Sequence, residues 1–412
     1  QIYSILYLCQ QNNINMFYLE NQDLSNKRVI IRVDLNVPLD KNSKVTDTTR
    51  IEACKGTVNT VIELGGSCVL ISHLGRPKGK EKKLSLKNIV DTVSIIMGRP
   101  VLFHEDCIGI DAEKATSVLK PGEIILMENL RFYDNEIEGD MTFAESLSKL
   151  GDVYVNDAFG TSHREHASTA LIAKFFKGKK FAGKLLQKEL EVINEIAEKG
   201  KKPVLAILGG AKVSSKLKIL YNLIQKVDKI IIGGGMAYTF IKAKGGNIGN
   251  SLFEEELLTN AKEILKIAKE SGKEIVLPDD TIASTDFDNN DQIKTFKSGE
   301  IEDGWMGLDI GSSSIEKFNQ TILSSNTVFW NGPMGVFEKE QFSKGTTSIC
   351  ISLKQAKENG VNVIVGGGDS IAALKKLGNK EWVTYISTGG GALLESLEGK
   401  TLPGVKALSN DY

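Results

Sequence analysis

Residues 181–216 read FAGKLLQKELEVINEIAEKGKKPVLAILGGAKVSSK and carry three successive signals: a helix, a strand and a basic glycine turn. The helix signal is a set of apolar residues four, seven and eleven positions apart, which is the spacing of one helix face. This face consists of Leu186, Leu190, Ile193 and Ala197. The glutamates at 189, 191, 195 and 198 are expected on its solvated side. The apolar run 204–208 follows with the length of a fully buried strand, so this stretch predicts an α/β fold with a parallel sheet.

The turn after this strand, Gly209-Gly210-Ala211-Lys212, combines bare backbone with a lysine. Lys216 comes four residues later, and we expect both lysines on one helix face. Free backbone N–H groups, a helix N-terminus and mobile cations are what a polyphosphate requires. The turn therefore indicates a nucleotide phosphate site.

Length and composition indicate a protein of ordinary globular character. At 412 residues, two domains or slightly more are expected. A formal net charge of −1 argues against a general nucleic-acid or membrane-surface binder, so we expect neither partner. The five cysteines are scattered and include no C-x-x-C pair, which favours a reducing, cytoplasmic compartment without disulfides or a zinc site.

The first fifteen residues differ in character from the rest. They are mildly apolar, but they lack both the basic start and the cleavage site of a secretory signal. Met16 directly precedes sequence with regular patterning. We expect Met16 to be the natural start and residues 1–15 to be a non-native or disordered extension.

Strand-like runs alternate with helix-length segments along the whole chain. The first half has runs at 29–33, 68–71, 123–127 and 153–155, with helical patterns such as 50–64 and 85–97 between them. In the second half, runs end at 209–210, 233–235, 278–280, 331–335, 366–369 and 388–391. Ligands of such sheets bind beyond the carboxyl ends of the strands, so the residues at these ends are the candidate site residues.

The chemistry of the strand ends differs between the halves. The first half is rich in cations and hydrogen-bonding groups suited to carboxylate and phosphate: Arg32, Asp34, Asn36, Arg50, His73, Arg76, Arg131, His163, Arg164 and His166. The second half has glycine runs with Lys212, Lys216, Glu338 and Asp369. Glycine lets backbone N–H groups approach phosphate, and one carboxylate suits Mg²⁺ shared with a nucleotide. We therefore expect a small phosphorylated acid in the first half and a nucleotide in the second.

These residues also allow other interpretations. His163 and His166 are spaced like a metal fragment, but no third ligand of suitable spacing follows. A nicotinamide-dependent oxidoreductase requires G-x-G-x-x-G, and a P-loop ATPase requires G-x-x-x-x-G-K-[ST]; neither motif is present. A two-domain protein that closes on one anion without chemistry remains an alternative.

From about Met16 to its end, the chain resembles phosphoglycerate kinases. The resemblance is carried by long, ordered motifs at 32–38, 72–77, 128–133, 156–166, 208–216, 330–338, 366–370 and 387–395. It implies two Rossmann-like α/β domains with mainly parallel sheets, joined by a helix and hinge, in a monomer. The domains would be a phosphoglycerate-binding domain at 16–183 completed by 389–412, an interdomain helix at 184–200, and a nucleotide-binding domain at 201–388.

The same resemblance implies the site residues. The phosphoglycerate ligands would be Asp34, Asn36, Arg50, His73, Arg76, Arg131 and Arg164. The nucleotide contacts would be Lys212, Lys216, Gly307, Asn331, Pro333, Val336, Glu338, Gly367, Gly368, Asp369 and Ser370, with Asp369 also the Mg²⁺ contact. The implied reaction is reversible phosphoryl transfer from 1,3-bisphosphoglycerate to ADP, giving 3-phosphoglycerate and ATP.

Such a transfer needs no strong base, because the attacking oxygen is already ionised. Its obstacle is the repulsion of two anions, about 4 kcal/mol at about 4 Å and an effective dielectric near 20. We expect Arg50, Lys212 and Mg²⁺ to cancel this repulsion, with backbone N–H groups at Gly389, Gly390 and Gly391 adding a helix N-terminus. Because Arg50 and Lys212 belong to different halves, we expect domain closure to complete the site.

Overall fold

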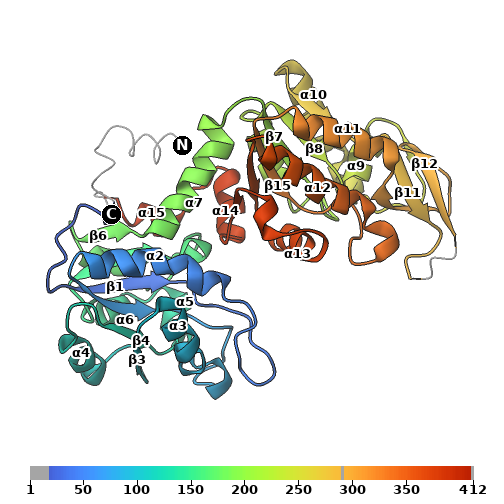
Figure 1. Ribbon diagram of the computed structural model, residues 1–412. Helices are drawn as coiled ribbons and strands as arrows, with labels where there is room; N and C mark the ends of the chain where they lie inside the picture. The colour runs from blue at the N-terminus through green and yellow to red at the C-terminus, as the bar shows by residue number, and fades with distance from the viewer. Residues whose placement is uncertain (1–17, 289–291, 410–412) are drawn as a thin grey trace. The chain divides into compact units, whose positions relative to one another are not determined.

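The computed structural model describes residues 18–288 and 292–409. The predicted extension at 1–15 and the predicted start at Met16 lie outside these residues. The chain divides into two compact units. The first comprises the chain up to Leu190 together with the segment from Lys400 onward, and the second is Glu191–Gly399. Figure 1 labels the elements of each unit.

The first unit is built on a six-stranded sheet in the order β3-β4-β2-β1-β5-β6. Every pairing in it is parallel. The strands are β1 (Arg28–Val33), β2 (Ser67–Ile71), β3 (Val101–His104), β4 (Ile124–Met127), β5 (Val153–Asp157) and β6 (Lys180–Ala182). The helices are α2 (Thr49–Glu63), α3 (Val90–Met97), α4 (Ile110–Ser117), α5 (Asp134–Glu138), α6 (Met141–Ser148) and α15 (Pro403–Lys406).

The second unit repeats this plan with the strand order β10-β8-β7-β15-β16-β17, again parallel throughout. The strands are β7 (Val204–Leu208), β8 (Lys229–Ile232), β10 (Glu274–Val276), β15 (Thr327–Asn331), β16 (Asn362–Val365) and β17 (Tyr385–Ile386). The helices are α8 (Leu217–Leu223), α9 (Met236–Ala243), α10 (Leu258–Glu270), α11 (Ser312–Leu323), α12 (Lys344–Glu358), α13 (Gly368–Leu377) and α14 (Gly391–Leu397).

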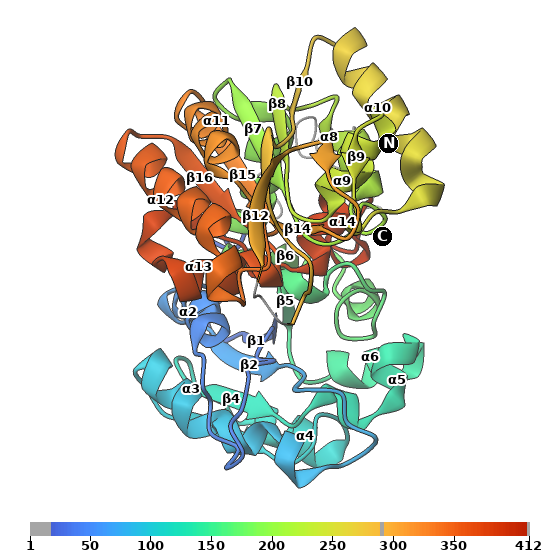
Figure 2. The same ribbon diagram turned by 90° about the vertical axis from the view of Figure 1, so that its right-hand side faces the viewer.

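Both sheets are covered by helices on two faces. Figure 2 shows α2 and α3 on one side of the first sheet and α5 and α6 on the other, and α11–α13 opposite α8–α10 around the second. The inner strands are buried along their length, as in β7, where all five residues are buried. Burial on both faces explains why these strands are continuous apolar runs rather than alternating patterns. The predicted α/β class with mainly parallel sheets is therefore confirmed.

Two small sheets in the second unit were not predicted from the sequence. One is antiparallel, in the order β12-β11-β14, and consists of β11 (Asp280–Ser284), β12 (Ile293–Lys297) and β14 (Met306–Ile310). The other pairs β9 (Asn247–Ile248) with β13 (Glu300–Ile301). β12 is short and mostly exposed, so its sequence lacks the apolar run by which the inner strands were recognised. β14 matters for function because it lines the pocket described below.

The helix between the halves is present, but its predicted faces are partly wrong. α7 (Lys184–Asn194) continues as a π-helical turn (Glu195–Lys199) and ends before Gly200. Its fully buried side chains include Glu189, which was expected on the solvated side. Residues 186, 189, 192 and 196 form the buried stripe, while 190, 193 and 197 are half-buried. Both sets have helical spacing, so periodicity alone does not decide between them. The predicted domain boundaries stay a prediction; the division between the units falls within α7.

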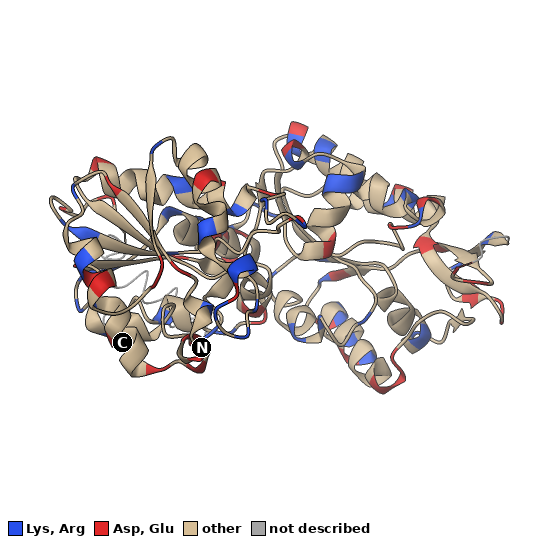
Figure 3. Ribbon diagram, turned by 90° about the horizontal axis from the view of Figure 1, so that it is seen from below, with Lys and Arg blue, Asp and Glu red and all other residues tan. Residues whose placement is uncertain are grey.

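Charge is distributed over the surface of both units rather than gathered on one side. In the view of Figure 3, Lys and Arg are interspersed with Asp and Glu on the helices of each unit. No helix among the described residues is both long enough and apolar enough to span a membrane. The cysteines at 54, 68, 107 and 350 are buried thiols.

Candidate active site

The carboxyl end of β1 and the start of α2 bring three predicted residues of the first unit together. Arg50 Nη1 donates to Asp34 Oδ2 at 2.7 Å. The backbone N–H of Asn36 donates to the other oxygen of Asp34 at 3.2 Å. Asn36 Oδ1 in turn accepts from the backbone N–H of Gly75, in the loop after β2, at 2.8 Å. Asp34 is 8% exposed, so this carboxylate fixes the direction of the Arg50 guanidinium.

The loops after β2 and β4 add two arginines and a histidine. Arg131 Nη1 donates to the carbonyl oxygen of Gly75 at 2.8 Å. Burial, reinforced by the charges of Arg32 and Arg164, lowers the pKa of Arg131 to about 10. His73 is 3% exposed, and Arg76 is exposed. Arg131 stays protonated at neutral pH, so it adds a cation beside Asp34.

The loop after β5 carries the remaining predicted cation. Arg164 Nε donates to His163 Nε2 at 3.2 Å. Burial, followed by the charges of Arg131, Arg32 and Arg164, lowers the pKa of His166 to about 4, so this ring is neutral at pH 7. Among the described residues, no group of three or more His, Cys, Asp or Glu side chains is arranged to hold a metal. Because these charged groups act on one another's pKa values, they form one cationic cluster at the ends of β1, β2, β4 and β5.

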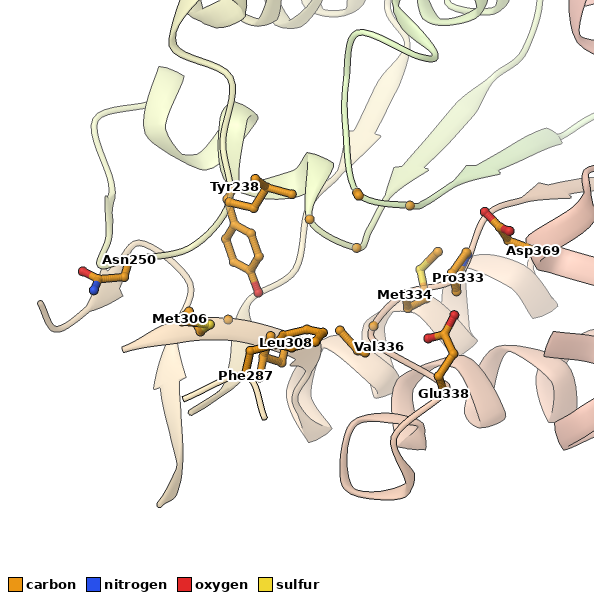
Figure 4. A pocket seen from close by; sticks show the side chains of 17 residues that line it. Tyr238, Asn250, Phe287, Met306, Leu308, Pro333, Met334, Val336, Glu338 and Asp369 are labelled. Atoms are coloured by element: carbon orange, nitrogen blue, oxygen red, sulfur yellow. The ribbon is translucent and has the colours of Figure 1, made fainter. Parts of the chain in front are cut away.

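The second unit contains a pocket of about 500 Å³. Figure 4 shows its side chains converging from α9, β14 and the turn after β15. Five predicted nucleotide contacts line it: Gly307, Pro333, Val336, Glu338 and Asp369. Sequence reasoning missed the apolar and aromatic part of the lining: Tyr238, Leu252, Phe287, Met306, Leu308 and Met334. Such residues carry no charge or glycine signal, and Met306 and Leu308 come from β14, which the sequence did not reveal.

Glycines allow the walls of this pocket to approach one another. A Cβ at Gly209 would lie 2.1 Å from the carbonyl oxygen of Pro333, and that oxygen also accepts from the N–H of Gly210 at 3.0 Å. The N–H of Gly234 donates to the carbonyl oxygen of Met334 at 3.1 Å. The glycine runs after β7 and β8 thus hold the turn after β15 by backbone contact. They therefore have a packing role in addition to the phosphate-binding role predicted from the sequence.

Gly307 is required for the position of an aromatic side chain. A Cβ at this residue would lie 1.9 Å from the Tyr238 hydroxyl and 2.7 Å from Thr281 Cγ2. The N–H of Gly307 donates to Ser251 Oγ at 2.9 Å. The Tyr238 ring therefore packs directly on the backbone of β14, where it forms one wall of the pocket.

The two predicted lysines differ in environment, and the prediction that they share a helix face is wrong. α8 begins at Leu217, with Lys216 at its N-cap and Lys212 in the preceding loop. Lys216 Nζ donates to Asn331 Oδ1. Burial lowers the pKa of Lys216, while the charge of Asp369 raises it. Lys212 is exposed. The loop after β7 extends through residue 216, so no helix forms between the two lysines.

The segment after β16 supplies a helix N-terminus and a carboxylate. Gly367 has φ +90°, and a Cβ there would lie 2.4 Å from Asn331 Nδ2. α13 begins at Gly368, so Asp369 lies in its first turn. Ser370 is fully buried, and its Oγ accepts from the N–H of Gly332 at 2.6 Å. Ser370 therefore stabilises the turn after β15 through this hydrogen bond.

The second predicted helix start is also present. α14 begins at Gly391, and the N–H of Gly389 donates to Ser387 Oγ at 3.1 Å. Gly390, at the N-cap, has φ +48°. Asp369 is an exposed carboxylate in the first turn of α13, and it fits a Mg²⁺ ion that keeps water ligands and is shared with phosphates, since Mg²⁺ rarely occupies an all-protein cage.

A family model described as phosphoglycerate kinase matches residues 19–400. The chain belongs to the phosphoglycerate kinase family. It is 48% identical over 390 residues to the chloroplastic phosphoglycerate kinase 1 of Arabidopsis thaliana, covering 95% of this chain and 81% of that relative. It is 47% identical over 390 residues to the cytosolic phosphoglycerate kinase of Triticum aestivum, covering 95% and 97% respectively.

Solved structures agree with this assignment. The phosphoglycerate kinase of Coxiella burnetii superposes with a TM-score of 0.87 at 38% identity, covering 95% of this chain and 98% of the other. The predicted family is therefore confirmed over nearly the whole chain, and the chain is a kinase. The family's reaction is the glycolytic phosphoryl transfer between 1,3-bisphosphoglycerate and ADP.

Proposed function

We propose that the first unit binds 3-phosphoglycerate or 1,3-bisphosphoglycerate and the second binds ADP or ATP with Mg²⁺. The observation that carries this proposal is the contrast between the two sites. The strand ends of the first sheet hold clustered guanidinium groups, whose planar fork suits carboxylate and phosphate. The second unit has an apolar pocket of about 500 Å³ bordered by glycine turns and Lys216, which suits a nucleoside with a phosphate tail.

The residue roles follow from this division. Asp34, Asn36, Arg50, His73, Arg76, Arg131 and Arg164 bind the acid. Lys212, Lys216, Gly307, Asn331, Pro333, Val336, Glu338, Gly367, Gly368, Asp369 and Ser370 form the nucleotide site. In this proposal Ser370 acts by holding the N–H of Gly332 rather than by touching phosphate, because its side chain is fully buried.

Charge cancellation is the central catalytic task. Both reacting groups are anions, and their repulsion of about 4 kcal/mol at about 4 Å must be offset by positioned cations. Arg50, oriented by Asp34, and the exposed Lys212 are the residues that would contact a transferring phosphoryl group. Asp369 would hold Mg²⁺, which neutralises nucleotide phosphate charge when bound. The backbone at Gly389, Gly390 and Gly391 adds N–H donors.

A coupled assay tests the activity directly. We expect 3-phosphoglycerate-dependent ATP consumption that requires Mg²⁺. If γ-labelled ATP keeps its label in the presence of 3-phosphoglycerate, the alternative of an anion-binding protein without chemistry is favoured.

Three variants test the residue roles. Arg76→Ala should raise the KM for 3-phosphoglycerate and leave that for ATP nearly unchanged, and Lys216→Ala should do the reverse. Arg50→Ala should lower kcat more than it changes either KM, because its contact is made in the transition state. The exposed residues Arg99 and Lys218 provide controls, since removing either side chain should alter none of these constants. A kcat near wild type for Arg50→Ala contradicts its catalytic role.

Domain closure, a monomeric state and a cytoplasmic location complete the proposal. Closure is required because the proposed cations belong to different units, and it would also exclude water from the acyl phosphate. Small-angle scattering should show compaction only with both substrates; equal compaction with either one alone contradicts it. Light scattering tests the monomer. Relatives include chloroplastic and cytosolic proteins, so cell fractionation is needed for the location.

A further inference from the structure

The side chain of Arg32 lies in the cationic cluster but cannot reach a substrate. It belongs to β1 and is completely buried. Its three kinds of nitrogen all have protein acceptors. Nε donates to Ser168 Oγ at 2.9 Å, Nη1 donates to the carbonyl oxygen of Val33, and Nη2 contacts His73 Nδ1 at 3.2 Å. A buried guanidinium with this set of partners acts through its neighbours.

The contact with His73 determines which ring nitrogen carries the proton. A guanidinium only donates hydrogen bonds and has no lone pair to offer. At the contact between Arg32 Nη2 and His73 Nδ1, the ring nitrogen must therefore be the acceptor. A neutral imidazole has one proton, so that proton is on Nε2. An imidazolium is excluded by the same reasoning, because both of its nitrogens are donors.

We propose that Arg32 is a positioning residue that holds His73 as a neutral ring with its proton on Nε2, so that Nε2–H donates to the bound phosphoglycerate. This inference rests on the proposed function in one respect, the identity of that anion.

The surroundings of His73 favour the neutral ring. Burial lowers the pKa of His73 well below 6.5, and the charges of Arg32, Arg131, Arg50 and His166 lower it further. The ring therefore stays neutral through the range in which an ordinary histidine titrates. Nε2 has no hydrogen-bond partner among the described residues, and Asp34, Arg50 and Arg131 belong to the same cluster.

A buried counter-charge keeps the Arg32 guanidinium in place. Ser168 Oγ accepts a hydrogen bond from Arg32 Nε, and its own O–H donates to Glu136 Oε1 at 2.6 Å. The N–H of Ser168 donates to Glu136 Oε2 at 2.9 Å. Burial raises the pKa of Glu136, while the charge of Arg32 and the bonds from Ser168 oppose that rise. A chain of contacts thus links Glu136 through Ser168 and Arg32 to His73.

Nuclear magnetic resonance of the full chain tests the protonation form. The chain has four histidines, so the imidazole ¹⁵N signals of His73 can be assigned with a His73→Gln variant. We expect the two-bond ¹H–¹⁵N pattern of the Nε2–H form from pH 5.5 to pH 8, without titration. A pattern with the proton on Nδ1, or a doubly protonated ring at pH 7, overturns the proposal. This measurement needs only the wild-type chain and does not depend on whether an Arg32 variant folds.

Substitution of Arg32 tests its role. Arg32→Met should let the His73 ring change tautomer or titrate, and should raise the KM for 3-phosphoglycerate about tenfold, the loss of roughly one charge-assisted hydrogen bond. Arg32→Lys keeps a donor and should restore the Nε2–H form. Arg28→Met is the matched control, because Arg28 lies on the same strand but pairs with Asp152. An unchanged His73 pattern in Arg32→Met contradicts a positioning role.

Titration with 3-phosphoglycerate separates this proposal from the proposed function. A shift of the Nε2–H signal on addition supports both. The expected tautomer combined with complete absence of 3-phosphoglycerate binding upholds the action of Arg32 on His73 and overturns the assigned substrate. Binding of 3-phosphoglycerate without any shift at His73 overturns the donor role of Nε2–H.

Discussion

Asp309 in β14 is a buried carboxyl whose charge state can be read from stability. It is 2% exposed, and its oxygens accept from the N–H groups of Ile310 at 2.9 Å and Gly345 at 2.8 Å. It also lies against the pocket of the second unit, since a Cβ at Gly335, which lines that pocket, would be 2.3 Å from its Oδ1. Burial raises the pKa of Asp309 from 3.8 to about 7, although both N–H groups lower it. The fold therefore favours the protonated acid.

The size of the effect follows from the two pKa values. A group whose pKa is higher in the folded state stabilises the fold at low pH, and that contribution is lost as the pH rises through about 7. Between pH 5 and pH 8 the loss is about 2.5 kcal/mol, at about 1.4 kcal/mol for each pKa unit. Asp309→Asn removes the titration, so the variant should gain about this much stability relative to wild type over that range.

Tryptophan fluorescence makes the measurement specific to the second unit. All three tryptophans, at 305, 330 and 382, belong to Glu191–Gly399. Urea unfolding followed by fluorescence at several pH values therefore reports on this unit. Asp303→Asn, which removes an exposed carboxyl, should show no comparable trend. The stability difference between wild type and Asp309→Asn could instead be constant with pH or change in the opposite direction. In that case the hydrogen bonds from the two N–H groups affect the pKa of Asp309 more than burial does, and the reasoning fails.

Three further outcomes are expected. Ser370→Ala leaves the buried N–H of Gly332 without its acceptor, and calorimetry should show ADP affinity about tenfold weaker while 3-phosphoglycerate affinity is unchanged. Asn129→Ala removes side-chain hydrogen bonds to the loop after β2 and should lower the free energy of unfolding of the first unit by about 2–4 kcal/mol, measured by scanning calorimetry. Partial burial raises the pKa of Asp152, but the hydrogen bonds from Arg28 lower it by more, so the net pKa is lowered. The contribution of this carboxylate to the stability of the fold is therefore lost progressively as the pH falls below about 4. Asp152→Asn should cost about 1 kcal/mol or less at pH 7 and less at pH 3 than at pH 7, as thermal melts at both pH values will show.

The fold was largely predictable because the inner strands have a clear sequence pattern. Runs such as 204–208 are continuous and apolar, and each is followed by turn residues. All six strand ends predicted for the second half belong to its six-stranded parallel sheet. The strands that were missed, such as β3, β6 and β12, are short and lie at sheet edges. β12 is mostly exposed and has no apolar run, while β3 and β6 have only four and three residues, so their patterns are weak.

The candidate site was predictable where its chemistry is polar. Charged residues and glycines at strand ends are easily recognised in a sequence. In the structure, Asp34 forms a hydrogen bond with Arg50, and Gly307 leaves room for the Tyr238 ring. The apolar wall of the pocket did not stand out, because residues such as Met306 and Leu308 resemble core residues in any sequence. Only the pairing of β14 with β11 brings them to the pocket.

The same limit explains why Arg32 could not be separated from ligand-binding residues by sequence alone. A charged residue at a strand end can face a ligand or lie beneath the residues that do. Arg32 and Asp34 are two residues apart, yet only Asp34 orients the proposed catalytic Arg50, while Arg32 contacts His73 from a fully buried position. Burial and hydrogen-bond direction, which depend on the whole fold, decide between a residue that binds and one that positions.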